Sequence, residues 1–146
     1  LREAVDRASI ALMAQAVGAM EAANKVCGAY VQERKQFGTA IGSFQAIQHI
    51  MADNFVAAHQ ARSMLYHALA NADADEATRS AALSAARLVI GEAGQTVSRN
   101  GIQVHGGYGL TDEYAIGHYF LRLMCIEKQY GDLIQHGERF GDSIFG

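Results

Sequence analysis

The sequence predicts an all-α fold, an antiparallel up-and-down bundle of four long helices with a short helix at the C-terminal end. First, the 146 residues contain no proline, whereas average usage of about 5% gives roughly seven, and proline breaks helix interiors. Second, half of the residues are hydrophobic and 18% are charged, as in a globular domain with a core of its own. Third, apolar residues recur at helical spacing, and no stretch alternates as a strand does.

The first two helices are predicted over residues 2–34 and 43–71. Apolar and small residues recur at helical spacing along the first. A loop follows over residues 36–42, and Ser43 is the predicted N-cap of the second helix, because a serine hydroxyl accepts a hydrogen bond from a free backbone N–H. The second helix is expected to bury one apolar stripe: Phe44, Ile47, Met51, Phe55, Ala58 and Leu65.

The third helix is predicted over residues 75–102, with a turn before it in which Asp73 and Glu76 have capping-box spacing. Its small residues allow close approach of neighbouring helices, although each glycine costs roughly 1 kcal/mol relative to alanine. Thr111 is the predicted cap of the fourth helix, and a last helix is expected over residues 132–145.

Composition excludes several classes of protein. A net charge of −3 argues against nucleic acid or an anionic membrane as the main partner. Cys27 and Cys125 form no disulfide framework or zinc pattern, so both are expected to be buried free thiols in a cytoplasmic protein. No metal site is predicted. The first residues lack both an initiator methionine and an apolar signal segment, so the sequence is expected to be a fragment of a longer chain.

A glycine-rich segment, residues 103–109, holds three glycines within four residues, Gly106, Gly107 and Gly109. Glycine adopts positive φ and admits a ligand close to the backbone. A glycine-rich turn at a helix start also presents free N–H groups that suit phosphate. The same pattern fits a plain turn between two helices, so it needs support from a second motif.

The second motif is the segment Glu33–Gly38. Its cation pair complements the dipole at a helix C-terminus, and glycine just beyond is a common stop signal. A simple helix end does not account for Phe37, which is followed by the apolar Ile41 and Phe44, in a surface turn.

The two motifs together resemble the C-terminal helical domain of acyl-CoA dehydrogenases, and the resemblance covers essentially the whole chain. It rests on residues 34–38, 41–49, 51–53 and 103–109, with Glu113 and Tyr114 after them. Within the family, the sequence is most similar to small subunits of two-subunit enzymes, including the pimeloyl-CoA and steroid side-chain types. That closer match lies in residues 15–20, 118–120 and 130–132.

The resemblance implies FAD bound across a subunit interface, with contacts from six residues: Arg34, Gln36, Phe37, Gln103, Gly106 and Gly107. Arg34 would bind the pyrophosphate of a neighbouring subunit's FAD, and Gln36 and Phe37 would line the cofactor. The other three would receive its adenosine-diphosphate part. The planar donor fork of arginine suits a diphosphate.

The implied reaction is α,β-dehydrogenation of an acyl-CoA thioester, with an electron acceptor flavoprotein and a neighbouring acyl-CoA dehydrogenase subunit as partners. It needs a carboxylate to remove the α-proton. Many family members place that glutamate just before the glycine that matches Gly131. This sequence has Tyr130 there, and an unperturbed tyrosine, with a pKa near 10, is a poor base.

Three interpretations of Tyr130 stay open, so the catalytic residue is unknown. The base comes from a partner subunit, or from Glu3 or Asp6 on the first helix, or from Glu127 or Asp132, with Glu127 expected to face solvent. The favoured function is an FAD-binding and oligomerisation domain in a subunit that lacks the usual base. The opposing hypothesis is a non-enzymatic helical interaction module that has lost flavin binding. The isolated 146 residues are expected to be inactive.

Overall fold

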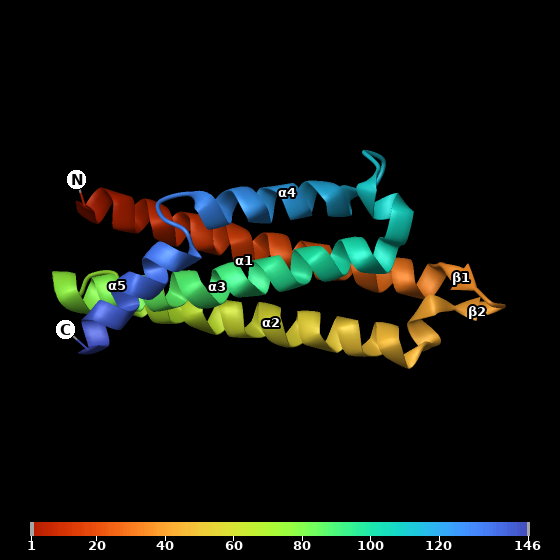
Figure 1. The fold of residues 1–146 in the computed structure, drawn as a ribbon, viewed down its shortest axis with the longest axis horizontal. Helices are drawn as coiled ribbons and strands as arrows, with labels where there is room; N and C mark the ends of the chain where they lie inside the picture. Colours follow the sequence, from red (N-terminus) through yellow and green to blue (C-terminus); the bar gives the residue numbers. More distant parts are fainter. Residues whose placement is uncertain (1, 146) are drawn as a thin grey trace.

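The structure, a computed structural model, describes residues 2–145 and is almost entirely helical. The first four helices run alternately up and down, and the fifth is short (Figure 1). The predicted fold class is therefore confirmed. The helices are α1 (Arg2–Glu33), α2 (Gln45–Ala70), α3 (Glu76–His105), α4 (Ala115–Lys128) and α5 (Leu133–Phe145).

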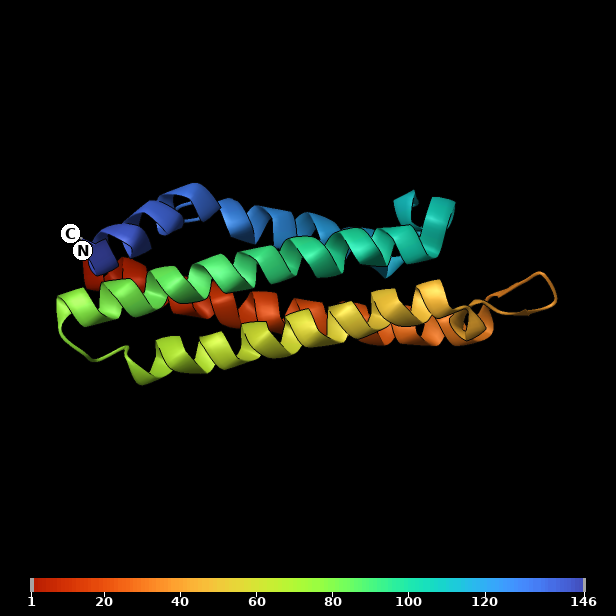
Figure 2. The ribbon, with the colours of Figure 1, turned by 60° about the horizontal axis from the view of Figure 1, so that its bottom comes forward.

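Helices α1 and α3 form the central pair of the bundle. They pack on each other, and both also pack on α2 and on α4. Those two helices lie on opposite sides of the pair (Figures 1 and 2). Helix α5 folds back onto α3. Because the chain reverses twice between them, α1 and α3 run parallel, and their C-terminal ends lie at the same end of the molecule (Figure 1).

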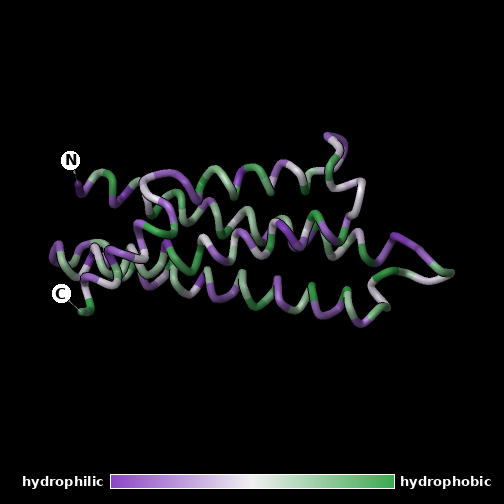
Figure 3. Tube along the Cα trace, in the orientation of Figure 1, coloured by the Kyte–Doolittle hydropathy of each residue, from purple (hydrophilic) through white to green (hydrophobic). Residues whose placement is uncertain are grey.

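The core runs along the central pair and is built from many small side chains. Green and purple segments alternate along each helix in Figure 3, as expected for helices that bury one face. Glycines of α3 admit neighbouring side chains, as predicted. A Cβ on Gly101 would lie 2.6 Å from Ile116 Cδ1, and a Cβ on Gly91 would lie 2.5 Å from Leu133 Cδ2.

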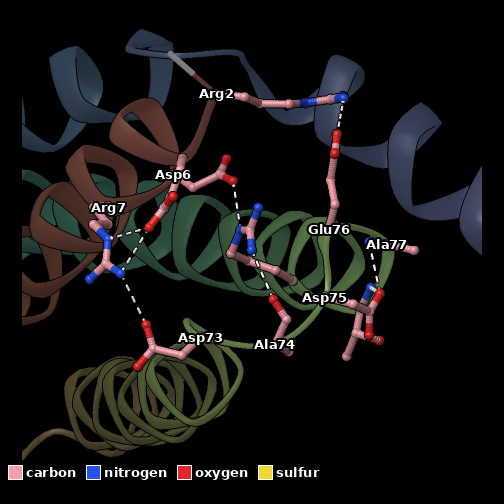
Figure 4. A network of polar contacts seen from close by, with 11 residues as sticks. Arg2, Asp6, Arg7, Asp73, Ala74, Asp75, Glu76 and Ala77 are labelled. Carbon is pink, nitrogen blue, oxygen red and sulfur yellow. Dashed lines mark hydrogen bonds and ion pairs between the residues drawn. The ribbon is translucent and has the colours of Figure 1, made fainter.

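The predicted capping box before α3 is wrong. Asp75 is the N-cap, and its carboxylate accepts hydrogen bonds from the backbone N–H groups of Ala77 and Thr78 at 3.0 and 3.1 Å. Asp73 lies two residues too early to cap, and it forms an ion pair with Arg7 at 3.0 Å (Figure 4).

The same polar network ties the start of α1 to the turn between α2 and α3. Arg7 also pairs with Glu3, and Arg79 Nε lies 2.9 Å from the Asp6 carboxylate. Arg79 additionally donates to the backbone carbonyl of Ala74 (Figure 4). These contacts fix that end of the bundle.

The two hydroxyl caps predicted elsewhere are also wrong, for one shared reason. A short 3-10 turn precedes each helix, η1 (Ile41–Ser43) before α2 and η2 (Gly106–Leu110) before α4. The Ser43 hydroxyl donates back to the Ala40 carbonyl at 2.7 Å, and the Thr111 hydroxyl donates to the Tyr108 carbonyl at 2.9 Å. Neither hydroxyl caps the helix after it.

A small antiparallel hairpin, absent from the prediction, joins α1 to α2. Its strands are β1 (Lys35–Gln36) and β2 (Thr39–Ala40), and the turn residues Phe37 and Gly38 both have positive φ, 53° and 82°. Two residues per strand are too few for a period-two pattern to show in sequence. The hairpin projects beyond the ends of the helices (Figures 1 and 2).

Helix α2 buries a different set of residues from the predicted stripe. Ala58 and Leu65 are buried as expected, but Phe44 is exposed and Phe55 is 61% exposed. The small residues of α2 face the central pair, which turns the large aromatic side chains outward. The expectation of two buried thiols also fails, because Cys125 is exposed while Cys27 is buried.

The boundaries of the remaining elements differ only slightly from the prediction, except that α3 continues three residues further, to His105. Within residues 2–145, no helix has both the length and the hydropathy required to cross a bilayer.

Candidate functional site

One hollow at the hairpin end of the bundle is lined by all six residues that the resemblance assigns to FAD. It has a volume of about 620 Å³, and we call it the cradle. Three of the six come from the end of α1 and the hairpin, and three from the end of α3 and η2. The two segments meet because α1 and α3 run parallel and end at the same level (Figure 1).

Arg34 supplies the positive charge of the cradle. Its Cζ lies 5.3 Å from the centroid of the Tyr108 ring. Among the described residues 2–145, no carboxylate lies within ion-pair distance of Arg34. A guanidinium that no acid neutralises suits an anionic ligand.

The glycine turn forms the opposite wall of the cradle. Gly106 has φ 61° and ψ −140°, a conformation that strongly favours glycine. A Cβ on Gly107 would meet nothing within 4 Å, so the backbone there faces open space. A Cβ on Gly109 would lie 3.1 Å from the carbonyl of Ile102, so this glycine lets the turn fold closely against α3.

From the sequence we expect free N–H groups at a helix start to bind phosphate at this turn, and the structure differs from that expectation. The turn follows the C-terminus of α3, and α4 begins only at Ala115. The Gly106 N–H is already bonded to the carbonyls of Gln103 and Ile102. The N-terminus of α4 therefore lies outside the lining of the cradle, and Arg34 supplies the attraction for an anion.

An aromatic cluster supports the cradle from behind. The rings of Tyr30 and His105 stack at 4.2 Å, and Tyr114 lies edge-on to both. His105 Nδ1 lies 2.8 Å from the Gly101 carbonyl, which can only accept, so Nδ1 carries the proton. Nε2 of this buried side chain has no partner. Because this nitrogen has almost no exposed surface, the ring serves the packing of the cluster behind the cradle.

Tyr130 lies in a second hollow, between α1 and the end of α4. This hollow, of about 500 Å³, is lined by Ala8, Ala11, Leu12, Gln15, Arg122, Gln129 and Tyr130. We call it the Tyr130 hollow. None of these lining residues is an acid. Tyr130 has φ 60° and Gly131 has φ 110°, so the turn places two successive residues in left-handed backbone conformations.

The two acids nearest to Tyr130 in sequence are engaged elsewhere. Glu127 is only 6% exposed, contrary to the expectation that it faces solvent. Its carboxylate accepts from the Leu133 N–H at 3.2 Å and pairs with Lys128 at 3.0 Å. The chain turns back into α5 directly after α4, and the Leu133 N–H at the start of α5 donates to this carboxylate. Asp132 accepts from the Gln135 N–H at 3.0 Å, a bond that lowers the pKa of Asp132.

The two candidate acids at the start of the first helix are also paired. Glu3 pairs with Arg7, and Asp6 pairs with Arg79. Neither acid lines the Tyr130 hollow. The structure thus brings none of the four alternative carboxylates into that hollow.

Arg87 holds the turn that carries Tyr130. This side chain of α3 is 5% exposed, and its Nη2 lies 2.6 Å from the Gln129 carbonyl and 3.0 Å from the Gly131 carbonyl. The carbonyls of Ile126 and Glu127 lie slightly farther away, at 3.2 and 3.3 Å. Burial lowers the pKa of Arg87, and the nearby Glu127 carboxylate opposes that shift.

Sequence reasoning missed several of these residues. Arg87 lies in an alanine-rich stretch with no motif around it, and its acceptors are about forty positions away in the chain. Tyr108 stands inside the glycine motif, and Tyr30 precedes Arg34 by one helical turn, so both carried a positional signal. Across residues 2–145, no three His, Cys, Asp or Glu side chains gather as a metal site requires. The prediction of no bound metal stays a prediction.

Comparison with known proteins shows the family to which the chain belongs. Residues 2–131 match the family model described as acyl-CoA dehydrogenase, C-terminal domain. The chain belongs to the acyl-CoA dehydrogenase family, and its bundle is the C-terminal domain of that family.

One related protein and two solved structures illustrate this similarity. The chain is 40% identical over 117 residues to acyl-CoA dehydrogenase IpdE2 of Mycobacterium tuberculosis, covering 80% of this chain and 35% of that protein. Among solved structures, it is similar to the Tcur3481–Tcur3483 steroid ACAD, with a TM-score of 0.90 and 33% identity, covering 95% of this chain and 38% of that one. It is also similar to PigA with FAD and proline, with a TM-score of 0.87 and 25% identity, covering 96% and 36%. The chain thus spans about a third of the length of these relatives.

Proposed function

We propose that this chain is the FAD-binding and oligomerisation domain of an acyl-CoA dehydrogenase subunit that lacks the usual catalytic base. One observation carries the proposal: the six residues predicted to contact FAD line a single hollow. Because the chain spans about a third of its relatives, we propose the activity for the longer protein in its oligomer. The similar structure described with FAD supports the choice of cofactor.

Each wall of the cradle has a role in this proposal. Arg34 donates to the diphosphate, where no acid of the described chain competes for it. Gln103, Gly106 and Gly107 receive the adenosine-diphosphate part, and Gly107 leaves open space for it. Gln36 and Phe37 lie on the projecting hairpin, and Phe37 is 94% exposed. An apolar side chain in that position needs cover from outside this bundle, which supports a cofactor shared across a subunit interface.

The proposed reaction is α,β-dehydrogenation of an acyl-CoA thioester. Bound flavin supplies the acceptor for the hydride that leaves the β-carbon. A base ionised near neutral pH must remove the α-proton. Tyr130 does not meet that requirement, and Glu3, Asp6, Glu127 and Asp132 are paired elsewhere. We therefore assign the base to the partner subunit and leave the catalytic residue of this chain unassigned.

The partners follow from the same proposal. A neighbouring acyl-CoA dehydrogenase subunit covers the hairpin and the outer face of α2, where Phe55, Tyr66 and Leu69 are exposed. The steroid ACAD structure is described by a pair of names, which supports a two-subunit assembly. An electron acceptor flavoprotein then takes up the electrons. Nucleic acid and membrane play no part in the proposal.

A non-enzymatic helical interaction module remains the second candidate. Tyr130 favours it, because the position that carries the family's base holds no carboxylate. The retained cradle argues against it, since a module without flavin has no use for an unpaired arginine beside a glycine turn.

Flavin retention tests the cradle. The full-length protein, co-purified with its partner subunit, is compared with Arg34→Met and with Arg99→Met, an exposed arginine of the same bundle as control. Removing charge-assisted hydrogen bonds to a diphosphate is expected to weaken FAD binding by about 10-fold or more, whereas Arg99→Met keeps the wild-type flavin content. An Arg34→Met complex with full flavin content contradicts the proposal, and a colourless wild-type complex favours the second candidate.

Turnover tests the missing base. Loss of a general base typically costs about 10²- to 10⁴-fold in rate. Tyr130→Phe removes the only titratable atom of that side chain, and we expect the complex to keep its turnover. A fall of that size in Tyr130→Phe, with flavin content unchanged, would show that Tyr130 handles the proton after all.

A further inference from the structure

We infer that Tyr108 is a positioning residue of the cradle: its ring holds the guanidinium of Arg34 in place for an incoming diphosphate. The inference rests on the proposed function and adds to it a residue that neither the motifs nor the family resemblance assigns. Tyr108 itself lines the cradle beside Gly107.

The contact between the two side chains has the geometry of a cation–π interaction. Arg34 Cζ lies over the Tyr108 ring at 5.3 Å from its centroid, inside the range of about 6 Å in which such pairs attract. The attraction acts through the charge and the ring face, so it uses none of the N–H donors of the guanidinium. Arg34 is therefore held without a hydrogen-bond partner that a ligand must displace.

Tyr108 is itself fixed from two directions. Its ring packs on Tyr114 at 5.5 Å, and Tyr114 contacts the stacked rings of Tyr30 and His105. Its backbone carbonyl accepts from the N–H and the hydroxyl of Thr111, at 3.2 and 2.9 Å. The ring under Arg34 thus has a rigid support, and Arg34, half-buried just beyond the end of α1, lies against it.

This support has a consequence for affinity. A free arginine loses side-chain entropy when it binds, and holding it beforehand removes part of that cost. A cation–π contact contributes about 0.5 to 2 kcal/mol, which corresponds to roughly 2- to 30-fold in a dissociation constant. The Tyr108 hydroxyl makes no hydrogen bond to any described residue, so the ring and not the hydroxyl carries the effect.

Calorimetric titration with ADP tests the inference, because ADP carries the diphosphate without the flavin ring. The flavin-depleted full-length complex is compared with Tyr108→Leu, Tyr108→Gln, Tyr108→Phe and Arg34→Met. We expect the two non-aromatic variants to bind ADP about 5-fold more weakly and Tyr108→Phe to match the wild type. Thermal unfolding of each variant checks that the fold is kept.

A double-mutant cycle separates positioning from mere stability. If Tyr108 acts through Arg34, then Tyr108→Leu causes no further loss of ADP affinity in an Arg34→Met background. An equal loss in both backgrounds, or wild-type affinity in Tyr108→Leu and Tyr108→Gln, overturns the inference but leaves the proposed function intact. If Arg34→Met itself leaves ADP binding unchanged, the proposed cradle fails and the inference fails with it.

Discussion

Arg87 is the residue on which the turn between α4 and α5 depends. A buried cation is tolerated there because four backbone carbonyls surround one of its nitrogen atoms. We predict that Arg87→Met lowers the free energy of unfolding by about 3 kcal/mol, because those carbonyls lose their hydrogen-bond donor and the buried Glu127 carboxylate loses a nearby positive charge. Urea denaturation measures the change. Arg99→Met is the matched control, with an expected effect below about 0.5 kcal/mol. An equally small effect of Arg87→Met would contradict the role of Arg87 in holding the turn.

His136 makes stability depend on pH. Burial lowers the pKa of His136 to about 4, and the positive charges of Arg87 and Arg139 add to the shift, while Asp132 opposes it. The folded protein keeps the ring neutral, whereas the unfolded chain binds a proton below about pH 6.5. This contribution to stability is therefore complete above that pH and is lost as the pH falls toward 4.

The predicted size of the pH effect is a loss of about 2 kcal/mol of unfolding free energy between pH 7 and pH 5. Urea denaturation at the two values measures it, and His136→Gln should remove most of the difference. Asp75 and Asp132, whose pKa values are lowered first by the Thr78 hydroxyl and by the Gln135 N–H respectively, contribute only at lower pH. An equal loss in the wild type and in His136→Gln would assign the pH dependence to other groups.

At the scale of elements, we predict that alanine substitutions at two glycines of α3 change stability in opposite directions. A Cβ on Gly94 would lie 3.6 Å from Leu123 Cδ2, an ordinary contact, so Gly94→Ala gains helix propensity and should stabilise by about 0.5 to 1 kcal/mol. A Cβ on Gly101 would lie 2.6 Å from the buried Ile116, so Gly101→Ala should destabilise by about 1 kcal/mol or more despite that gain. Thermal unfolding decides, and a shift of both variants in one direction contradicts the packing described for α3.

Periodicity predicted the long helices because each buries one continuous face, but it did not predict how they begin. Ser43 and Thr111 have the right chemistry for caps, yet the 3-10 turns before α2 and α4 move each helix start beyond them. Such turns are set by contacts with the rest of the bundle and leave little trace in sequence. The outward direction of Phe55 was missed similarly, because a preference for small residues between closely packed helices overrides side-chain hydrophobicity.

The candidate site was predictable where a motif exists and not elsewhere. Arg34, Phe37 and Gln103 belong to sequence signatures, and the structure gathers them in the cradle. Their role toward FAD stays a prediction. Arg87 binds carbonyls about forty positions away in the chain. Glu127 and Tyr108 contact Leu133 and Tyr114, which lie six positions away across a turn. No single motif records either kind of contact.

At the scale of the whole molecule, the cradle and the Tyr130 hollow lie at the two ends of α4. The cradle adjoins the turn before α4, and the Tyr130 hollow adjoins the turn after it. The 14 residues of α4 separate the two by about 20 Å of helix. The parallel pair α1 and α3 holds both hollows in one frame. The hairpin, which lines the cradle, projects beyond the ends of the helices (Figure 2).

The visible spectrum of the full-length protein, purified alone and then with its partner subunit, tests the central claim most directly. We predict flavin absorbance only in the co-purified complex, with bleaching when acyl-CoA is added, because we propose that this chain supplies the diphosphate cradle but not the base. Flavin bound by the chain alone and bleached by acyl-CoA would contradict that claim, since it would show a self-sufficient enzyme.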